Sequence, residues 1–270
     1  PSSSLWDYGK RVYERHDDFQ RYVDSGVFHP ESSTFKNYAL FCLLQRPTNT
    51  QIDAVEFLKG AQVACDRVIN GTFSAEVRDY VTGKESVKPA VVQAMETMFE
   101  PACYQRHFLP RVRYYAQSTD TIDMEIAGST LEFTGVHLTG VSMRRMTLAK
   151  FKKKEIVRRV IAGRMAELQK TKTHNELRVD ALEMLGDETI RERLAGEEGT
   201  ITEEDAATMV ERLRLSVVCD VLLSVDGVHN TDSDKLHAKT NTSYLMCFES
   251  LVTRPDEVDW RIENLDELRR

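Results

Sequence analysis

The sequence predicts an α+β fold, in which N-terminal helices pack on a curved antiparallel sheet of about four strands in a cone-shaped domain. From Ile52 up to Tyr115, apolar residues recur at every third or fourth position, as in helices, and from Thr121 onward they alternate, as in strands. A charged tract of helical spacing interrupts the strands. We therefore expect an N-terminal arm over 1–50 and an α+β domain over 51–270, interrupted by a charged helical insertion over 147–212.

The helices are predicted from apolar spacing and from the residues that begin and end them. Residues 1–50 mix aromatic and charged residues without a sustained period, which indicates a partly helical arm that breaks after Pro47. Thr50 and Asp53 stand in capping-box spacing and predict a helix start. An apolar stripe follows and should end at Asn70-Gly71; it consists of Ile52, Val55, Leu58, Cys65, Val68 and Ile69.

Shorter helices should follow this stripe. One is expected over 73–81, where Gly83 stops it, and another begins at Pro89, which suits a first helical turn. Pro101 and Pro110 predict that the helical run up to Tyr115 is broken.

The strands are predicted from alternation. Over 131–143 the register slips at Gly135 and again at Gly140, which indicates two β-bulges that bend the sheet. The clearest strand has its apolar face over 215–225 and closes at Asp226-Gly227. Two further strands are expected over 244–251 and 258–262.

Net charge, the length of apolar stretches and the spacing of cysteines argue against several classes of protein. The chain has 270 residues and a formal net charge of -7, which argues against a protein whose whole surface coats nucleic acid. No stretch approaches the roughly 20 apolar residues of a membrane-spanning helix, so any membrane association should be peripheral. The five cysteines are scattered and lack C-x-x-C spacing, which predicts neither a disulfide framework nor a zinc site.

Several segments together resemble the Tim-forty-four-like domain family, which belongs to the nuclear-transport-factor-two-like fold. The resemblance covers about residues 51–146 and 213–265, whereas the tract over 147–212 departs from the compact family domain. The segments that carry it are Phe57-Leu58-Lys59-Gly60-Ala61, Phe99-Glu100-Pro101, Phe133 to Val141, Tyr244 to Glu249, and Trp260-Arg261-Ile262.

The resemblance implies a binding role at the matrix face of the mitochondrial inner membrane. Family members include a peripheral translocase subunit that tethers the import motor, a mitochondrial large-ribosomal-subunit protein, and a protein associated with the matrix-facing AAA protease. The implied function is a non-catalytic peripheral subunit or adaptor of a large respiratory, ATP-synthase or translocase assembly. A ribosomal or protease-associated role is the alternative, and the acidic balance counts against the ribosomal one.

A basic amphipathic stretch over 144–164 is the main candidate for a partner or lipid surface. Cations beside an apolar stripe suit anionic head groups such as those of cardiolipin, or a partner subunit, with ribosomal RNA less favoured. The alternative is a helix that packs on the domain with a solvated charged face. The candidate residues are Lys150, Lys152, Lys153, Lys154, Arg158, Arg159 and Arg164.

An enzyme that works in the pocket of the cone is the rival class, with Asp123, Glu132, Asp220 or Tyr244 as groups that could face the pocket. No nucleotide-binding loop or nucleophile motif occurs in the sequence. The spacing of His229, Asp232, Asp234 and His237 in a polar turn defines no coordination geometry. We therefore expect no catalytic residue, no cofactor and no metal.

Overall fold

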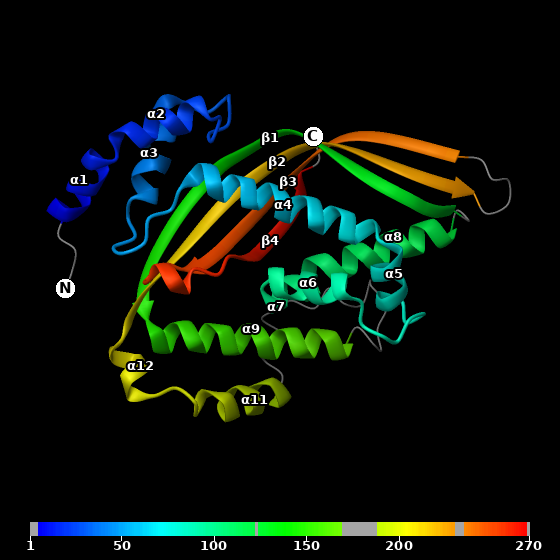
Figure 1. Cartoon of the computed structure of the whole chain (residues 1–270). Coiled ribbons are helices and arrows are strands. Elements are labelled where there is room, and N and C mark those ends of the chain that lie inside the picture. The colour runs from blue at the N-terminus through cyan, green and yellow to red at the C-terminus, as the bar shows by residue number, and fades with distance from the viewer. Residues whose placement is uncertain (1–4, 122–123, 169–187, 230–234, 269–270) are drawn as a thin grey trace.

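The computed structural model describes residues 5–121, 124–168, 188–229 and 235–268, and the α+β prediction is confirmed. N-terminal helices pack against an open antiparallel sheet of four strands in the order β1-β2-β3-β4. The strands are long and curved, and helix α4 crosses in front of them (Figure 1). Their bounds are β1 Met124–Thr147, β2 Met209–His229, β3 Lys235–Leu251 and β4 Arg261–Leu268.

Bulges in β1 lie where the alternation slips in the sequence. The register against β2 shifts between Phe133 and Gly135 and between Leu138 and Gly140, so both predicted bulges are confirmed. A third shift falls between Ile126 and Gly128. Bulges increase the local twist and bend, which lets one strand of this length follow a curved sheet.

One face of the sheet forms the main core together with α4 (Ala54–Phe73). The predicted apolar face of β2 is confirmed, because its members from Leu215 to Leu223 are buried and Val225 packs against the same core. Leu58, Cys65 and Val68 of α4 belong to this core. The contact between the stripe of α4 and the alternating face of β2 therefore organises the domain.

The start of α4 differs from the capping-box prediction. Asp53 is the N-cap, and its side chain accepts hydrogen bonds from the backbone N–H groups of Val55 and Glu56. Thr50 lies outside the helix, and its buried hydroxyl has no hydrogen-bond partner in the structure. The helix also continues past Gly71 to Phe73, because Gly71 packs against Met95 and stays helical.

The helices after α4 follow the predicted breaks. Gly83 adopts a positive φ of 80° just after α5, and Pro89 is the N-cap of α6. The run up to Thr121 is broken by a π-helix over Tyr104–Phe108. The bounds are α5 Ala75–Val81, α6 Ala90–Met98, α7 Pro101–Cys103 and α8 Leu109–Thr121.

The last strand begins later than predicted. A 3-10 turn over Pro255–Glu257 precedes it, and β4 starts at Arg261 rather than Val258. Val258 and Trp260 are half-buried and pack against the main core from this connection.

Residues 5–50, the described part of the predicted arm, form three helices that pack against the rest of the domain. Tyr22, Phe41 and Leu44 are buried in the same core as the sheet. The backbone N–H of Leu138 in β1 donates to the carbonyl of Val27 at 2.7 Å. The helices are α1 Leu5–Glu14, α2 His16–Asp24 and α3 Thr34–Leu44.

The charged tract connects β1 to β2 and has a small core of its own. Its long helix α9 (Leu148–Leu168) runs below the sheet in Figure 1, with α11 (Glu188–Glu198) and α12 (Glu203–Ala207) beneath it. Residues from α9 and α11 form a second cluster apart from the main core, made of Ile156, Val160, Ile161, Met165 and Ile190.

Candidate functional site

Charged side chains gather on the face of the sheet opposite α4, at the end where α9 packs. Alternation along β2 puts Arg212 and Arg214 on this outer face, because the buried residues Leu213 and Leu215 point to the inner one. The register pairs Arg214 with Glu249 of β3. Glu263 of β4 joins them by ion pairs to both arginines. We call Arg158, Arg212, Glu249 and Glu263 the ion cluster.

Arg158 of α9 connects the helix to this face. Its guanidinium lies 3.1 Å from Glu249 and 2.5 Å from Glu263, and its side chain is only 14% exposed. It also lies 3.8 Å from Glu100, the N-cap of α7, whose carboxylate accepts from the N–H groups of Ala102 and Cys103. Arg158 therefore joins α9 to β3, β4 and α7 at one point.

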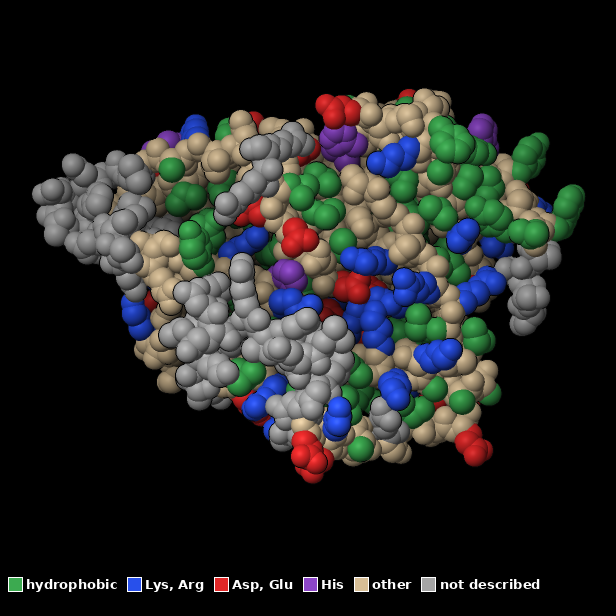
Figure 2. Space-filling model, turned by 180° about the vertical axis from the view of Figure 1, so that it is seen from behind, with side chains coloured by type: hydrophobic (Ala, Val, Ile, Leu, Met, Phe, Trp, Pro, Cys, Tyr) green, Lys and Arg blue, Asp and Glu red, His purple; other side chains and the backbone are tan. Residues whose placement is uncertain are grey.

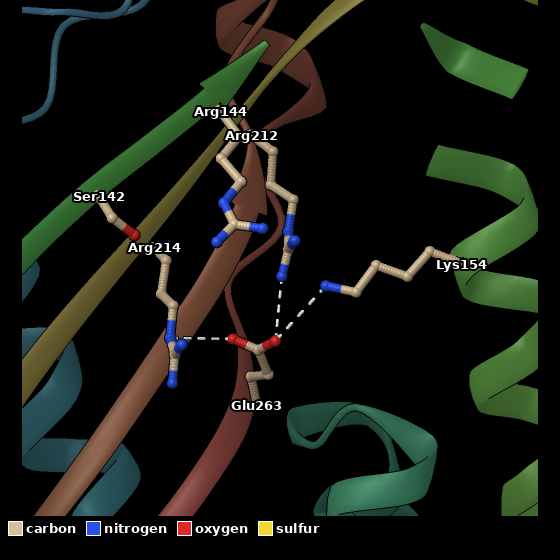
Figure 3. Close-up of a pocket in the computed structure, with 6 residues that line it drawn as sticks. All are labelled: Ser142, Arg144, Lys154, Arg212, Arg214 and Glu263. Carbon is tan, nitrogen blue, oxygen red and sulfur yellow. Dashed lines mark hydrogen bonds and ion pairs between the residues drawn. The ribbon is translucent and has the colours of Figure 1, made fainter. Parts of the chain in front are cut away.

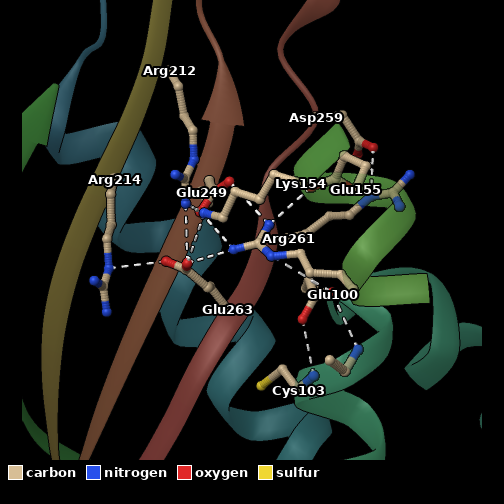
Figure 4. Close-up of polar contacts among 12 residues, drawn as sticks. Glu100, Cys103, Lys154, Glu155, Arg212, Arg214, Glu249, Asp259, Arg261 and Glu263 are labelled. Atoms are coloured by element: carbon tan, nitrogen blue, oxygen red, sulfur yellow. Dashed lines mark hydrogen bonds and ion pairs between the residues drawn. The ribbon is translucent and has the colours of Figure 1, made fainter. Parts of the chain in front are cut away.

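The ion cluster is buried and electrostatically coupled. Figure 4 shows Lys154, Arg212, Glu249 and Glu263 pointing toward one another. Burial alone would raise the pKa of Glu263, but the surrounding cations Arg158, Arg214, Arg212 and Lys154 hold it below the usual value. Since truncation of one partner would leave buried charge uncompensated, the cluster fixes α9 against the sheet.

A small cationic pocket opens beside the ion cluster (Figure 3). Its volume is about 100 Å³, and Arg144 and Ser142 of β1, Arg212 and Arg214 of β2 and Lys154 of α9 line it with a single acid, Glu263. Seen from behind, Lys and Arg side chains gather around a few acids near the middle of the face in Figure 2.

Burial first, and neighbouring positive charge second, lower the pKa of two of the pocket's cations, Lys154 and Arg212. The pKa of Lys154 falls to about 8, first through burial and then through the proximity of Arg158 and Arg212. The pKa of Arg212 falls to about 10, mainly through burial, although Glu263 opposes the change. Glu263 lines the pocket and Glu249 pairs with Arg212 and Lys154, so two acids stand against the four cations that line it.

An apolar groove of about 520 Å³ lies on the α4 side, between α4 and the segment that enters β4. Phe57 forms its centre, with ring centroids 4.8 Å from Trp260 and 5.4 Å from Phe248. The only charged residues that line it are the acids Asp53 and Glu56. Its other apolar lining residues are Ile52, Ala61, Ala64, Met98, Pro255, Val258 and Ile262.

The seven predicted basic residues do not form one surface. Lys154 and Arg158 face the sheet at the ion cluster, whereas Lys150 and Lys153 are exposed on α9. The remaining three form ion pairs within the tract: Lys152 with Asp205 at 2.8 Å, Arg159 with Glu197 at 3.5 Å, and Arg164 with Glu167 at 3.4 Å. Part of this charge therefore has a structural use that its spacing did not indicate.

The groups considered for an enzyme do not converge. Tyr244 is buried on the inner face of the sheet, whereas Asp220 lies on the outer face and accepts a hydrogen bond from Ser243. Burial raises the pKa of Tyr244. Glu132 is exposed, and Asp123 lies outside the described residues.

Most of the polar turn after β2 lies outside the residues that the structure describes. This applies to Asp232, Asp234 and the side chain of His229, while His237 lies 2.5 Å from Asp226. Among the described residues, no group of three or more His, Cys, Asp or Glu side chains is arranged to hold a metal ion.

The cationic pocket was not predicted from the sequence. Arg144 stands opposite Arg212 in the β1–β2 register, and Ser142 stands opposite Arg214. The available signal was the alternation of Arg212 and Arg214 with buried apolar residues. It could not identify a pocket, because the pairing with β1 and the position of α9 are not readable from spacing.

Comparisons with protein-family models, with curated proteins and with solved structures found no match for this chain. Within the described ranges, no helix is both long enough and apolar enough to cross a membrane.

Proposed function

We propose that this protein is a non-catalytic adaptor, a peripheral subunit of a large assembly on the matrix side of the mitochondrial inner membrane. The observation that carries the binding role is the open apolar groove between α4 and the entry to β4. Its volume of about 520 Å³ lies within the range of ligand and peptide sites, and it has no convergent carboxylate and phenol. The compartment comes from the sequence resemblance.

The proposed occupant of the groove is the apolar face of a helix from a partner subunit. Phe57, Trp260 and Phe248 supply adjacent aromatic rings, the kind of surface at which binding energy concentrates. Asp53 and Glu56 at the rim favour a helix that carries Lys or Arg beside its apolar residues. Lys150, exposed on α9, is the residue we propose to meet anionic lipid such as cardiolipin.

Gly60 allows the groove to be tested without damage to the core. It lies on α4 in the groove wall, and a Cβ atom added there would meet nothing within 4 Å. Gly60→Leu should fill part of the groove while it improves helix propensity by up to about 1 kcal/mol. Gly163→Leu is the matched control, since Gly163 is also helical and open to solvent.

The experiment compares partner recovery from mitochondrial membranes. Tagged wild-type protein should be released by alkaline carbonate and, after mild detergent extraction, should co-purify with a defined set of inner-membrane subunits. We expect Gly60→Leu to reduce that recovery at least tenfold and Gly163→Leu to leave it unchanged, with equal melting temperatures. Equal recovery by both variants would show that the groove is not the docking site, and resistance to carbonate would contradict a peripheral subunit.

A further inference from the structure

We propose that the cationic pocket between β1, β2 and α9 binds a phosphoryl group. It is a different surface from the apolar groove, and the inference does not depend on the compartment or on the partner. Figure 3 shows the side chains of Arg212, Arg214 and Lys154 converging on Glu263, and Arg212 and Lys154 also pair with Glu249.

Arg144 and Arg212 form an arrangement that folding alone does not favour. They are direct cross-strand partners in the β1–β2 ladder, and like charges directly opposite each other destabilise a sheet. Within the described part of the chain, the side chain of Arg144 has no hydrogen bond or ion pair. A bound anion between the two guanidinium groups would convert this repulsion into attraction.

Arg212 also has an unused donor. The residue lines the pocket and is 7% exposed, and its buried Nε–H has no hydrogen-bond partner in the structure, although its terminal nitrogen pairs with Glu249 and Glu263. A buried donor left without an acceptor costs free energy, so an acceptor from a ligand would be favourable there. Arg144, Arg214, Lys154 and the hydroxyl of Ser142 supply further donors around the same space.

The volume of the cationic pocket and the hydrogen-bond donors that line it indicate which class of ligand fits. At about 100 Å³ the pocket lies well below the roughly 300 to 1,000 Å³ of sites that enclose whole organic ligands, so it fits a small anion or a head group. A phosphoryl group carries about −1.5 to −2 charges and three strong acceptor oxygens. Arginine forks match phosphate oxygens in paired hydrogen bonds. The three arginines and one lysine that line the pocket carry more charge than the two carboxylates that pair with them, Glu263 and Glu249.

The electrostatics of Lys154 agree with this geometry and supply a readout. Its pKa lies near 8 because burial and the neighbouring arginines disfavour its charged form. A dianion in the pocket would stabilise the ammonium group, so the pKa of Lys154 should rise when the ligand binds.

The test titrates the full chain with inorganic phosphate at low ionic strength, by calorimetry and by NMR of the Lys154 side chain. We expect saturable binding, an upward shift in the pKa of Lys154, and at least a tenfold loss of affinity in Arg144→Gln. Arg159→Gln removes the same charge from the exposed side of α9 and should bind phosphate as the wild type does.

Arg144→Glu provides a second, independent variant. Its carboxylate would stand in for the ligand opposite Arg212, so it should abolish phosphate binding, raise the pKa of Lys154 without ligand, and melt no lower than the wild type. Absence of saturable phosphate binding by the wild type, or equal affinity of Arg144→Gln and Arg159→Gln, would overturn the proposal.

Vesicles distinguish the two sources of the phosphoryl group. If phosphatidylcholine vesicles that contain cardiolipin bind the wild type better than Arg144→Gln, and free phosphate competes, the ligand is a lipid head group. If phosphate binds and these vesicles do not discriminate between the two proteins, the ligand is a soluble phosphate compound.

Discussion

Arg158 illustrates how a single side chain holds two layers of this fold together. It extends from α9 into a nearly buried position between Glu249, Glu263 and Glu100, which come from β3, β4 and the start of α7. The acids it faces are 7 to 15% exposed, and two of them, Glu249 and Glu263, also pair with Arg212 and Lys154. The residue therefore positions α9 rather than presenting charge to a partner.

Arg158→Ala should lower the free energy of unfolding by about 3 to 5 kcal/mol, since it removes from three nearly buried carboxylates the one cation that they share. Arg159→Ala, one position along on the exposed side of α9, should stay within about 0.5 kcal/mol of the wild type. Denaturant unfolding of the three proteins measures the difference. Similar midpoints for both variants would mean that Arg158 is not a structural connection.

Among the elements, α4 shows how tertiary contacts select a helix start. Asp53 caps the helix and also lies 3.0 Å from Arg21 of α2, while the hydroxyl of Tyr22 accepts from the N–H of Ala54 at 3.2 Å. These contacts occupy the first turn from the side of α2. Thr50 lies three residues earlier and is left with a buried hydroxyl that has no partner in the structure.

Asp53→Ala should cost about 0.5 to 2 kcal/mol of stability, the usual effect of a lost N-cap. Thr50→Val should cost nothing measurable or stabilise the protein, because it replaces an unsatisfied buried hydroxyl with a methyl group of the same shape. Thermal unfolding distinguishes the two sites. If Thr50→Val destabilised the protein more than Asp53→Ala, Thr50 would be the helix cap.

For the whole molecule, the decisive feature is that one core extends from the N-terminal helices to the last strand. Phe41 of α3 is fully buried in the same cluster as Met246 of β3 and Ile262 of β4. The charged tract has a separate cluster around Ile156 and Ile190. The N-terminal helices should consequently unfold with the sheet.

Phe41→Ala should lower the free energy of unfolding by about 3 to 5 kcal/mol. The loss of stability should affect the sheet as well as the N-terminal helices. The exposed Trp6 can be replaced by Phe, which leaves Trp260 as the single tryptophan and as a fluorescence probe beside the groove. Its transition should coincide with the loss of helical circular dichroism. An unchanged Trp260 transition would indicate an independent N-terminal unit.

Local patterns in the sequence were enough to predict the fold class and its main elements. The α4 stripe, the apolar face of β2 and the bulges at Gly135 and Gly140 follow from spacing within one segment, because a helix or strand face has a fixed period. The Tim-forty-four-like resemblance and the mitochondrial role stay predictions. Spacing within one segment cannot predict contacts between segments that are distant in the chain.

Tertiary structure decided the candidate site, because its charges come from four separate elements. Arg144, Lys154, Arg212 and Glu263 come together only through the β1–β2 register, the order of the strands and the packing of α9. The same packing turned Arg158 inward, although its spacing is indistinguishable from that of the exposed Arg159. By itself, the sequence determined how much charge α9 carries; the long-range contacts decided which charges are neutralised and which remain to meet a ligand.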